Sequence, residues 1–169
     1  FVLATVHRAD STDDPARLSS IMGALNAIAE EIPVILPLHP RTRKNLASLS
    51  PSFLAPRASR LHLIGPVGYL DMVMLEKNAK VIITDSGGVQ KEAYFHSVPC
   101  VTVRDETEWV ELVDTGANHL VGTDKLSIID SFERMKDKNI EANRLYGNGD
   151  SAEKIVSVLT QGRARQTRT

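Results

Sequence analysis

The fold of this chain is decided by one stretch of sequence, Val81-Ile82-Ile83-Thr84-Asp85-Ser86-Gly87-Gly88-Val89-Gln90-Lys91-Glu92-Ala93. Its first four residues are apolar or β-branched and predict a buried strand, and the residues from Val89 onward have helical spacing. A strand that passes through Ser-Gly-Gly directly into a helix aims free backbone N–H groups and the positive end of the helix at one point. Such a point favours a phosphate group.

The side chains of this stretch also fit a phosphate site. Gly87 and Gly88 lack the Cβ atoms that would keep an anion away from the backbone, and Ser86 can cap the helix or donate its hydroxyl to a phosphate oxygen. Glu92 lies about one turn into the helix, where its carboxylate can accept hydrogen bonds from sugar hydroxyls. A tight, capped turn without a ligand is the alternative that an isolated Ser-Gly-Gly leaves open. The spacing matches neither the Walker P-loop nor the dinucleotide fingerprint.

Strands and helices alternate over the rest of the chain. The first helix is marked by Asp13 or Asp14 as its cap and by Pro15 in its first turn. Apolar strands that alternate with helices predict a doubly wound α/β domain, in which a parallel sheet has helices on both faces. Strands are expected at 1–6, 33–38, 60–64, 81–84, 99–103 and 118–121, and further helices at 41–49, 69–78, 89–96, 107–115, 125–138 and 151–159.

Other polar residues follow the strands at the edge where such sheets bind ligands. His7 and Arg8 come directly after the first strand, where the histidine can act as acid or base and the arginine can grip an anion with two hydrogen bonds. His39 follows the second strand, and the charged run Arg104-Asp105-Glu106-Thr107-Glu108 follows the fifth. A surface turn, a helix cap and a solvated loop, respectively, are the alternatives for these three groups.

Composition narrows the classes of function. The 169 residues, 42% of them hydrophobic, suffice for one domain, and 20 basic against 21 acidic residues give a net charge of −1. This balance provides no general attraction to nucleic acid or to an anionic membrane. Cys100 is interpreted as a buried residue, and as the single cysteine it excludes an internal disulfide. No apolar run approaches the about 20 residues that span a bilayer, no signal-peptide pattern is present, and no zinc-ligand spacing occurs, so a cytoplasmic domain without a metal is expected.

Three clusters, in the order His7-Arg8, Thr84 to Ala93 and Arg104 to Glu108, resemble the non-hydrolysing UDP-N-acetylglucosamine 2-epimerases, and the run Thr84-Asp85-Ser86-Gly87-Gly88-Val89-Gln90 is the most specific of these matches. The resemblance extends to Pro37-Leu38-His39-Pro40, Leu120-Val121-Gly122-Thr123-Asp124 and Tyr146-Gly147-Asn148-Gly149, and covers nearly the whole chain. It implies a GT-B-type fold, in which two Rossmann-like domains hold a nucleotide sugar between them. This chain is then the second, C-terminal domain, with a UDP-binding unit at 1–161 and a flexible tail at 162–169. The N-terminal domain is expected to be absent, because the chain opens on a strand that is already under way.

The resemblance also implies roles for individual residues. Glu92 would bind the ribose, and His7 would act as a catalytic-site residue near the phosphate and sugar. Arg8 and His39 would belong to a regulatory site for a second substrate molecule. The residues implied to bind UDP are Arg8, Ser86, Gly87, Gly88 and Glu92.

The implied reaction inverts C2 of the sugar and converts UDP-N-acetylglucosamine to UDP-N-acetylmannosamine. UDP is eliminated to leave a glycal and is added back on the other face, with no metal or redox cofactor. Such a reaction serves the synthesis of cell-surface polysaccharides. The acid and base carboxylates lie on the family's first domain, through which full-length members form homodimers, so this chain alone is expected to bind UDP weakly and to be inactive.

Two residues depart from the pattern of many family members. Trp109 stands where an arginine helps to bind the nucleotide, and Met72 stands where an aromatic residue lies near the uracil. The run Thr107-Glu108-Trp109-Val110-Glu111 resembles a branch that includes epimerases of UDP-2,3-diacetamido-2,3-dideoxy-glucuronic acid. This substrate, the donor-binding half of a GT-B-type glycosyltransferase and a non-catalytic nucleotide-sugar sensor therefore stay open as alternatives.

Overall fold

The computed structural model describes residues 1–49, 60–141 and 145–166, with side chains as far as residue 160. In this part of the chain six strands form one sheet, in which every neighbouring pair is parallel. The strand order is β3-β2-β1-β4-β5-β6. The order reverses between β1 and β4, and ligands of such sheets bind beyond the carboxyl ends of the strands at this reversal. The strands are β1 Val2–Thr5, β2 Val34–Pro37, β3 Leu61–Ile64, β4 Val81–Thr84, β5 Cys100–Thr102 and β6 Asn118–Leu120.

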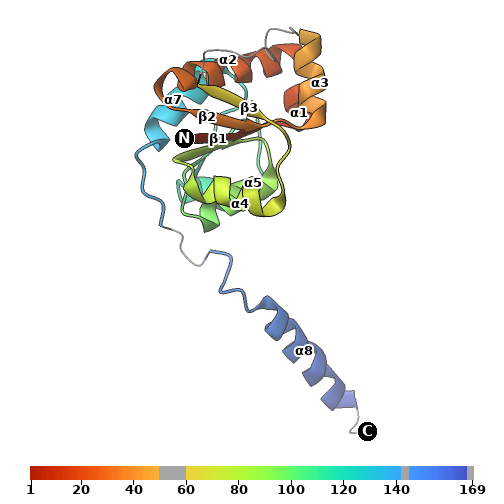
Figure 1. Cartoon of the computed structure of the whole chain (residues 1–169). Coiled ribbons are helices and arrows are strands. Elements are labelled where there is room, and N and C mark those ends of the chain that lie inside the picture. The colour runs from red at the N-terminus through yellow and green to blue at the C-terminus, as the bar shows by residue number, and fades with distance from the viewer. Residues whose placement is uncertain (50–59, 142–144, 167–169) are drawn as a thin grey trace.

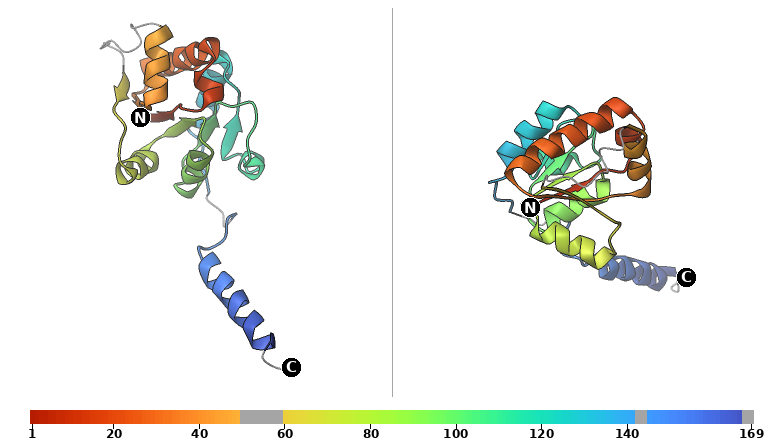
Figure 2. Two further views of the ribbon diagram at one scale, coloured as in Figure 1. Left: turned by 90° about the vertical axis from the view of Figure 1, so that its right-hand side faces the viewer. Right: turned by 45° about the horizontal axis from the view of Figure 1, so that its top comes forward.

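Helices cover both faces of the sheet, as Figures 1 and 2 show: α2, α3 and α7 lie on one face, and α4 and α5 on the other. The prediction of a doubly wound, Rossmann-like domain is therefore confirmed. Asp14 caps α2 as expected, since its side chain accepts hydrogen bonds from the backbone N–H groups of Ala16 and Arg17. The helices are α1 Ala9–Thr12, α2 Pro15–Glu31, α3 Pro40–Leu49, α4 Tyr69–Asn78, α5 Gly87–Phe95, α6 Val110–Asp114, α7 Lys125–Met135 and α8 Ser151–Gln166.

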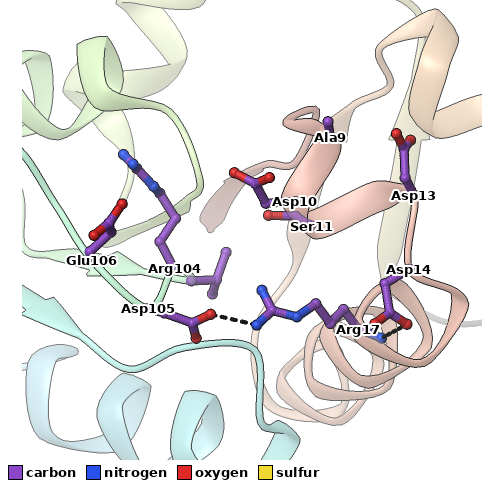
Figure 3. Close-up of a pocket in the computed structure, with 10 residues that line it drawn as sticks. Ala9, Asp10, Ser11, Asp13, Asp14, Arg17, Arg104, Asp105 and Glu106 are labelled. Carbon is purple, nitrogen blue, oxygen red and sulfur yellow. Dashed lines mark hydrogen bonds and ion pairs between the residues drawn. The ribbon is translucent and has the colours of Figure 1, made fainter.

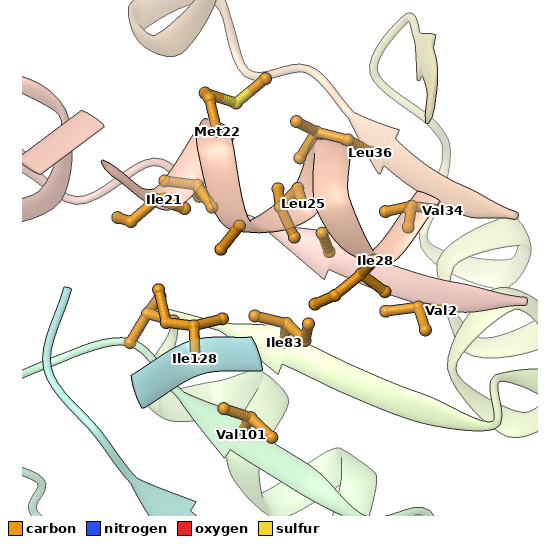
Figure 4. Packing of buried hydrophobic residues seen from close by; sticks show 14 of the residues in the cluster. Val2, Ile21, Met22, Leu25, Ile28, Val34, Leu36, Ile83, Val101 and Ile128 are labelled. Carbon is orange, nitrogen blue, oxygen red and sulfur yellow. The ribbon is translucent and has the colours of Figure 1, made fainter. Parts of the chain in front are cut away.

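The core has a part on each face of the sheet. The larger part packs Leu25 and Ile28 of α2 and Ile128 of α7 against the strands (Figure 4). The smaller part lies under α4 and α5 and contains Cys100, which is 1% exposed. Burial raises the pKa of the Cys100 thiol to about 12, which confirms the interpretation of this cysteine as a packed core residue.

Several helices differ from the sequence-based expectation, and α7, for example, ends at Met135 instead of residue 138. The short helix α1 was not expected, and α5 begins at Gly87 instead of Val89, so that both glycines belong to its first turn. Helix α6 begins at Val110, three residues later than expected. The reason is that Thr107 is held by tertiary contacts: its hydroxyl donates to Gln90 Oε1 at 2.6 Å and accepts from the N–H of Trp109.

Helix α8 stands apart from the rest of the molecule in Figure 1. Its described side chains are all exposed, and they include the apolar Ile155, Val156, Val158 and Leu159. The helix runs past the expected end at residue 159 to Gln166, while a flexible tail at 162–169 stays a prediction. Among the described residues, no helix is both long and apolar enough to cross a membrane.

Candidate functional site

The N-terminus of α5 presents unpaired backbone donors beside the reversal of strand order. Ser86 caps the helix, because its Oγ accepts from the N–H of Val89 at 3.4 Å. Its own N–H donates to Thr84 Oγ1 at 2.9 Å. The N–H groups of Gly87 and Gly88 have no acceptor within the described part of the chain, as is usual for the first turn of a helix. The Ser86 hydroxyl accepts in the cap and keeps its hydrogen for a ligand.

The two glycines are not required by the backbone conformation, since neither has a positive φ. A Cβ atom on Gly87 would lie 3.4 Å from Trp109 Nε1 and 3.5 Å from Glu108 Oε2, which is ordinary contact distance. On Gly88 the nearest atom would be Ser86 Oγ at 3.9 Å. Neither the backbone conformation nor the described neighbours therefore require glycine at these two positions.

Asp85 ties the turn after β1 to the turn after β4. Its side chain is fully buried and accepts hydrogen bonds from the N–H of His7 at 2.9 and 3.2 Å and from the N–H of Arg8 at 2.9 Å. The same carboxylate lies 3.4 Å from His7 Nδ1. Asp85 thereby fixes both the backbone and the ring of His7, a role that sequence reasoning missed although Asp85 directly precedes Ser86.

His7 and His39 lie side by side, with their ring centroids 5.7 Å apart. His39 Nδ1 accepts from the N–H of Arg41 at 3.2 Å, a contact of the helix-capping kind, while a role of His39 in a ligand site stays a prediction. Both histidines line a small apolar pocket of about 210 Å³, and Met72 and Val89 form part of its wall. The structure thus brings together residues that follow β1, β2 and β4.

Arg8 meets the charged run after β5. Its guanidinium lies 3.9 Å from Glu108 Oε1, and the other oxygen of Glu108 accepts from Arg104 Nη1 at 2.8 Å. The hydrogen bond from Arg104 is the main reason why the pKa of Glu108 lies below its usual range, with smaller contributions from its backbone and the charge of Arg8. The charged run after β5 therefore contacts Arg8, which follows β1 at the same edge of the sheet.

A larger cavity of about 730 Å³ lies beside the N-terminus of α2 (Figure 3). Arg17 forms an ion pair with Asp105 across it. None of the residues implied to bind UDP lines this cavity, which instead carries Asp10, Asp13, Asp14, Arg104 and Glu106. Within the described residues, no group of three or more His, Cys, Asp and Glu side chains is arranged to hold a metal ion.

Comparison with known proteins shows the family of this chain. The family model described as UDP-N-acetylglucosamine 2-epimerase matches residues 1–160. The chain belongs to this family. The prediction from the three polar clusters is therefore confirmed at the level of the family.

Two members of the epimerase family are similar over most of this chain. A UDP-2,3-diacetamido-2,3-dideoxy-D-glucuronate 2-epimerase of Pseudomonas aeruginosa is 48% identical over 163 residues, which make up 95% of this chain and 44% of that protein. The crystal structure of the Methanocaldococcus jannaschii UDP-GlcNAc 2-epimerase in complex with UDP-GlcNAc and UDP superposes with a TM-score of 0.87 at 43% identity, over 95% of this chain and 45% of that one. The chain thus spans about half the length of these relatives.

A heptosyltransferase of Escherichia coli with ADP shares the fold alone, at 12% identity and a TM-score of 0.51. This likeness supports the GT-B-type assignment of the fold. It covers 79% of this chain and 42% of that one.

In this epimerase-family chain, Trp109 contacts the turn at Ser86, Gly87 and Gly88. Its Nε1 donates to the carbonyl oxygen of Gly87 at 2.9 Å. The Nζ of Lys91 lies 4.2 Å from the centre of the Trp109 ring and 4.4 Å from that of Tyr146, so one ammonium group contacts two aromatic faces. Trp109 therefore anchors the first turn of α5.

A buried polar network continues from this turn into the sheet. Gln90 Oε1 accepts from Thr107 and from Asn118 Nδ2 at 3.0 Å, and Asn118 Oδ1 accepts from Thr102 at 2.7 Å. Gln90 Nε2 also donates to the carbonyl oxygen of Ser86 at 3.3 Å. Sequence reasoning did not identify these partners, because they come from three separate elements.

Proposed function

We propose that this chain is the UDP-binding half of a nucleotide-sugar 2-epimerase. The observation that carries the proposal is the capped N-terminus of α5, whose unpaired N–H groups lie at the reversal of strand order beside a histidine fixed by Asp85. In this proposal the diphosphate binds the N–H groups of Gly87 and Gly88, the Ser86 hydroxyl and the Arg8 guanidinium. Helix termini with free donors bind such anions without a metal.

The ribose and the uracil of the nucleotide are proposed to bind next to the diphosphate. Glu92, on the same helix, accepts the ribose hydroxyls, and the uracil enters the apolar pocket with Met72 in its wall. His7 follows β1, and its Nδ1 lies 3.4 Å from the Asp85 carboxylate. In the proposal His7 is a catalytic-site residue that lies near the sugar and the leaving phosphate. The role of Arg8 and His39 in a regulatory site stays a prediction.

The reaction of the whole protein is proposed to be inversion at C2 by elimination and re-addition of UDP. The carboxylates that act at C2 belong to the other domain, so this chain alone binds UDP without turnover. UDP-N-acetylglucosamine, with UDP-N-acetylmannosamine as product, is the first candidate for the substrate. A cytoplasmic homodimer that serves polysaccharide synthesis is the corresponding proposal for the full-length protein.

A second candidate substrate is UDP-2,3-diacetamido-2,3-dideoxy-glucuronic acid. It is favoured by 48% identity to the Pseudomonas aeruginosa enzyme that is named for this sugar. Turnover of each sugar nucleotide by the full-length protein would separate the two candidates.

Calorimetric titration of the chain with UDP, UDP-N-acetylglucosamine and ADP tests the nucleotide site. We expect a preference for the uridine nucleotides, together with weaker UDP binding in Ser86→Ala and Glu92→Ala. Equal affinity for ADP, or indifference to both substitutions, would refute the proposed site. Measurable epimerisation by the isolated chain would refute the assignment of the catalytic carboxylates to the other domain.

A further inference from the structure

Glu76 of α4 is an unusual residue in this structure. Its side chain is 1% exposed, and among the described residues its two carboxyl oxygens are the buried side-chain atoms without a hydrogen-bond partner. A buried carboxyl group without partners destabilises a fold by several kcal/mol when it is charged, as an order of magnitude. Its retention in the core therefore calls for a physical explanation.

The groups that face Glu76 come from α5, which packs against α4. They are Glu92, which is proposed to bind the ribose, and His96, whose Nε2 lies 3.9 Å from Glu76 Oε2. Burial is the main reason why the pKa of Glu76 is raised to about 7, and the negative charge of the nearby Glu92 adds to it. Near neutral pH the Glu76 carboxyl therefore exists in both forms, and its protonated form presents an O–H donor to a neighbouring carboxylate.

We propose that Glu76 is a positioning residue, whose buried O–H group holds the Glu92 carboxylate in place for the ribose of a bound nucleoside diphosphate. The inference rests on the proposed role of Glu92. When Glu76 loses its proton, the donor is lost and two carboxylates face each other in a partly buried space, which displaces Glu92 from the ribose. Ribose recognition is then strong below neutral pH and weak above it.

The test compares UDP with 2′,3′-dideoxy-UDP, which lacks both ribose hydroxyls, by calorimetry on this chain at pH 6.5 and 8.0. The ratio of the two dissociation constants isolates the ribose hydroxyls, and it cancels the titration of the diphosphate that both ligands share. For one required proton with a pKa of about 7, the advantage of UDP falls by at most about eightfold between these pH values. In Glu76→Gln the amide donates but does not titrate, so the ratio is expected to stay constant.

Two further variants complete the design. Glu76→Met keeps a similar volume without a donor, and its ratio is expected to be low at both pH values. Glu30→Gln changes an exposed glutamate of α2 and is expected to behave like the unmodified chain. Carbon-13 NMR of the Glu76 carboxyl provides an independent measurement, and its titration is expected near pH 7.

The outcomes separate this inference from the proposed function. A pH-dependent ratio that persists in Glu76→Gln, or a ratio that does not vary with pH in the unmodified chain, overturns the positioning role and leaves the UDP site intact. Equal affinity for the two ligands at pH 6.5, or binding of neither, overturns the role of Glu92 and this inference with it.

Discussion

The replacement Asp85→Asn removes the charge that holds the turns after β1 and β4 together. The carboxylate accepts three backbone contacts from His7 and Arg8, and an asparagine offers one acceptor oxygen in the same volume. Its NH2 group then points a donor at another donor. Hydrogen bonds to a charged group contribute about 1.5–3 kcal/mol each, and a buried donor left unpaired adds a similar cost, so we expect a loss of about 3 kcal/mol.

For a domain of this size, about 3 kcal/mol lowers Tm by roughly 6–12 °C. Thermal unfolding followed by circular dichroism measures the change, and UDP binding well below Tm measures the displacement of His7 and Arg8. The matched control is Asp114→Asn at the exposed end of α6. As a surface substitution, it is expected to change the free energy of unfolding by no more than about 0.5 kcal/mol. If Asp85→Asn melts within 2 °C of that control, on the order of experimental error, the structural role assigned to Asp85 is wrong.

Three further predictions concern the turn at Ser86, Gly87 and Gly88 and the core. Gly87→Ala meets only ordinary contacts, so Tm is expected to stay nearly constant while the new methyl group weakens UDP binding; a large loss of Tm would contradict the ordinary contacts described at this residue. Trp109→Phe removes the hydrogen bond to the Gly87 carbonyl and is expected to cost about 1 kcal/mol in urea unfolding, whereas an unchanged midpoint would show that the bond contributes nothing. Cys100, with its pKa raised to about 12, is expected to react with a thiol reagent at pH 8 only as fast as the chain unfolds, and rapid labelling under native conditions would refute its burial.

The alternation of strands and helices, and the edge of the sheet at which the candidate site lies, follow from local sequence patterns. The strand Val81–Thr84 is buried on both faces, and the helix cap Ser86 follows two residues later. The strand, the turn and the helix are therefore all encoded within a few residues. His7 and His39 were placed at the same edge because the carboxyl ends of parallel strands lie together.

Tertiary contacts decide the features that the sequence did not reveal. No sequence pattern singles out Glu76 on α4, yet it is buried where α4 packs against α5. Asp85 acts on His7 from 78 residues away, and no local pattern contains such a partner. The start of α6 was displaced for the same reason, since Thr107 binds Gln90 of α5.

The central place of β1 in the sheet has a consequence for folding kinetics. β1 pairs with β2 on one side and with β4 on the other, where Val2 is opposite Val81 and Thr5 opposite Thr84. Contacts between residues so distant along the chain require the closure of a long loop and form slowly. Because His7 and Asp85 lie just beyond these two strands, the nucleotide site is assembled only when the middle of the sheet closes. UDP added during refolding would then bind only the fully folded chain, which forms last. It would not bind a collapsed state that forms earlier.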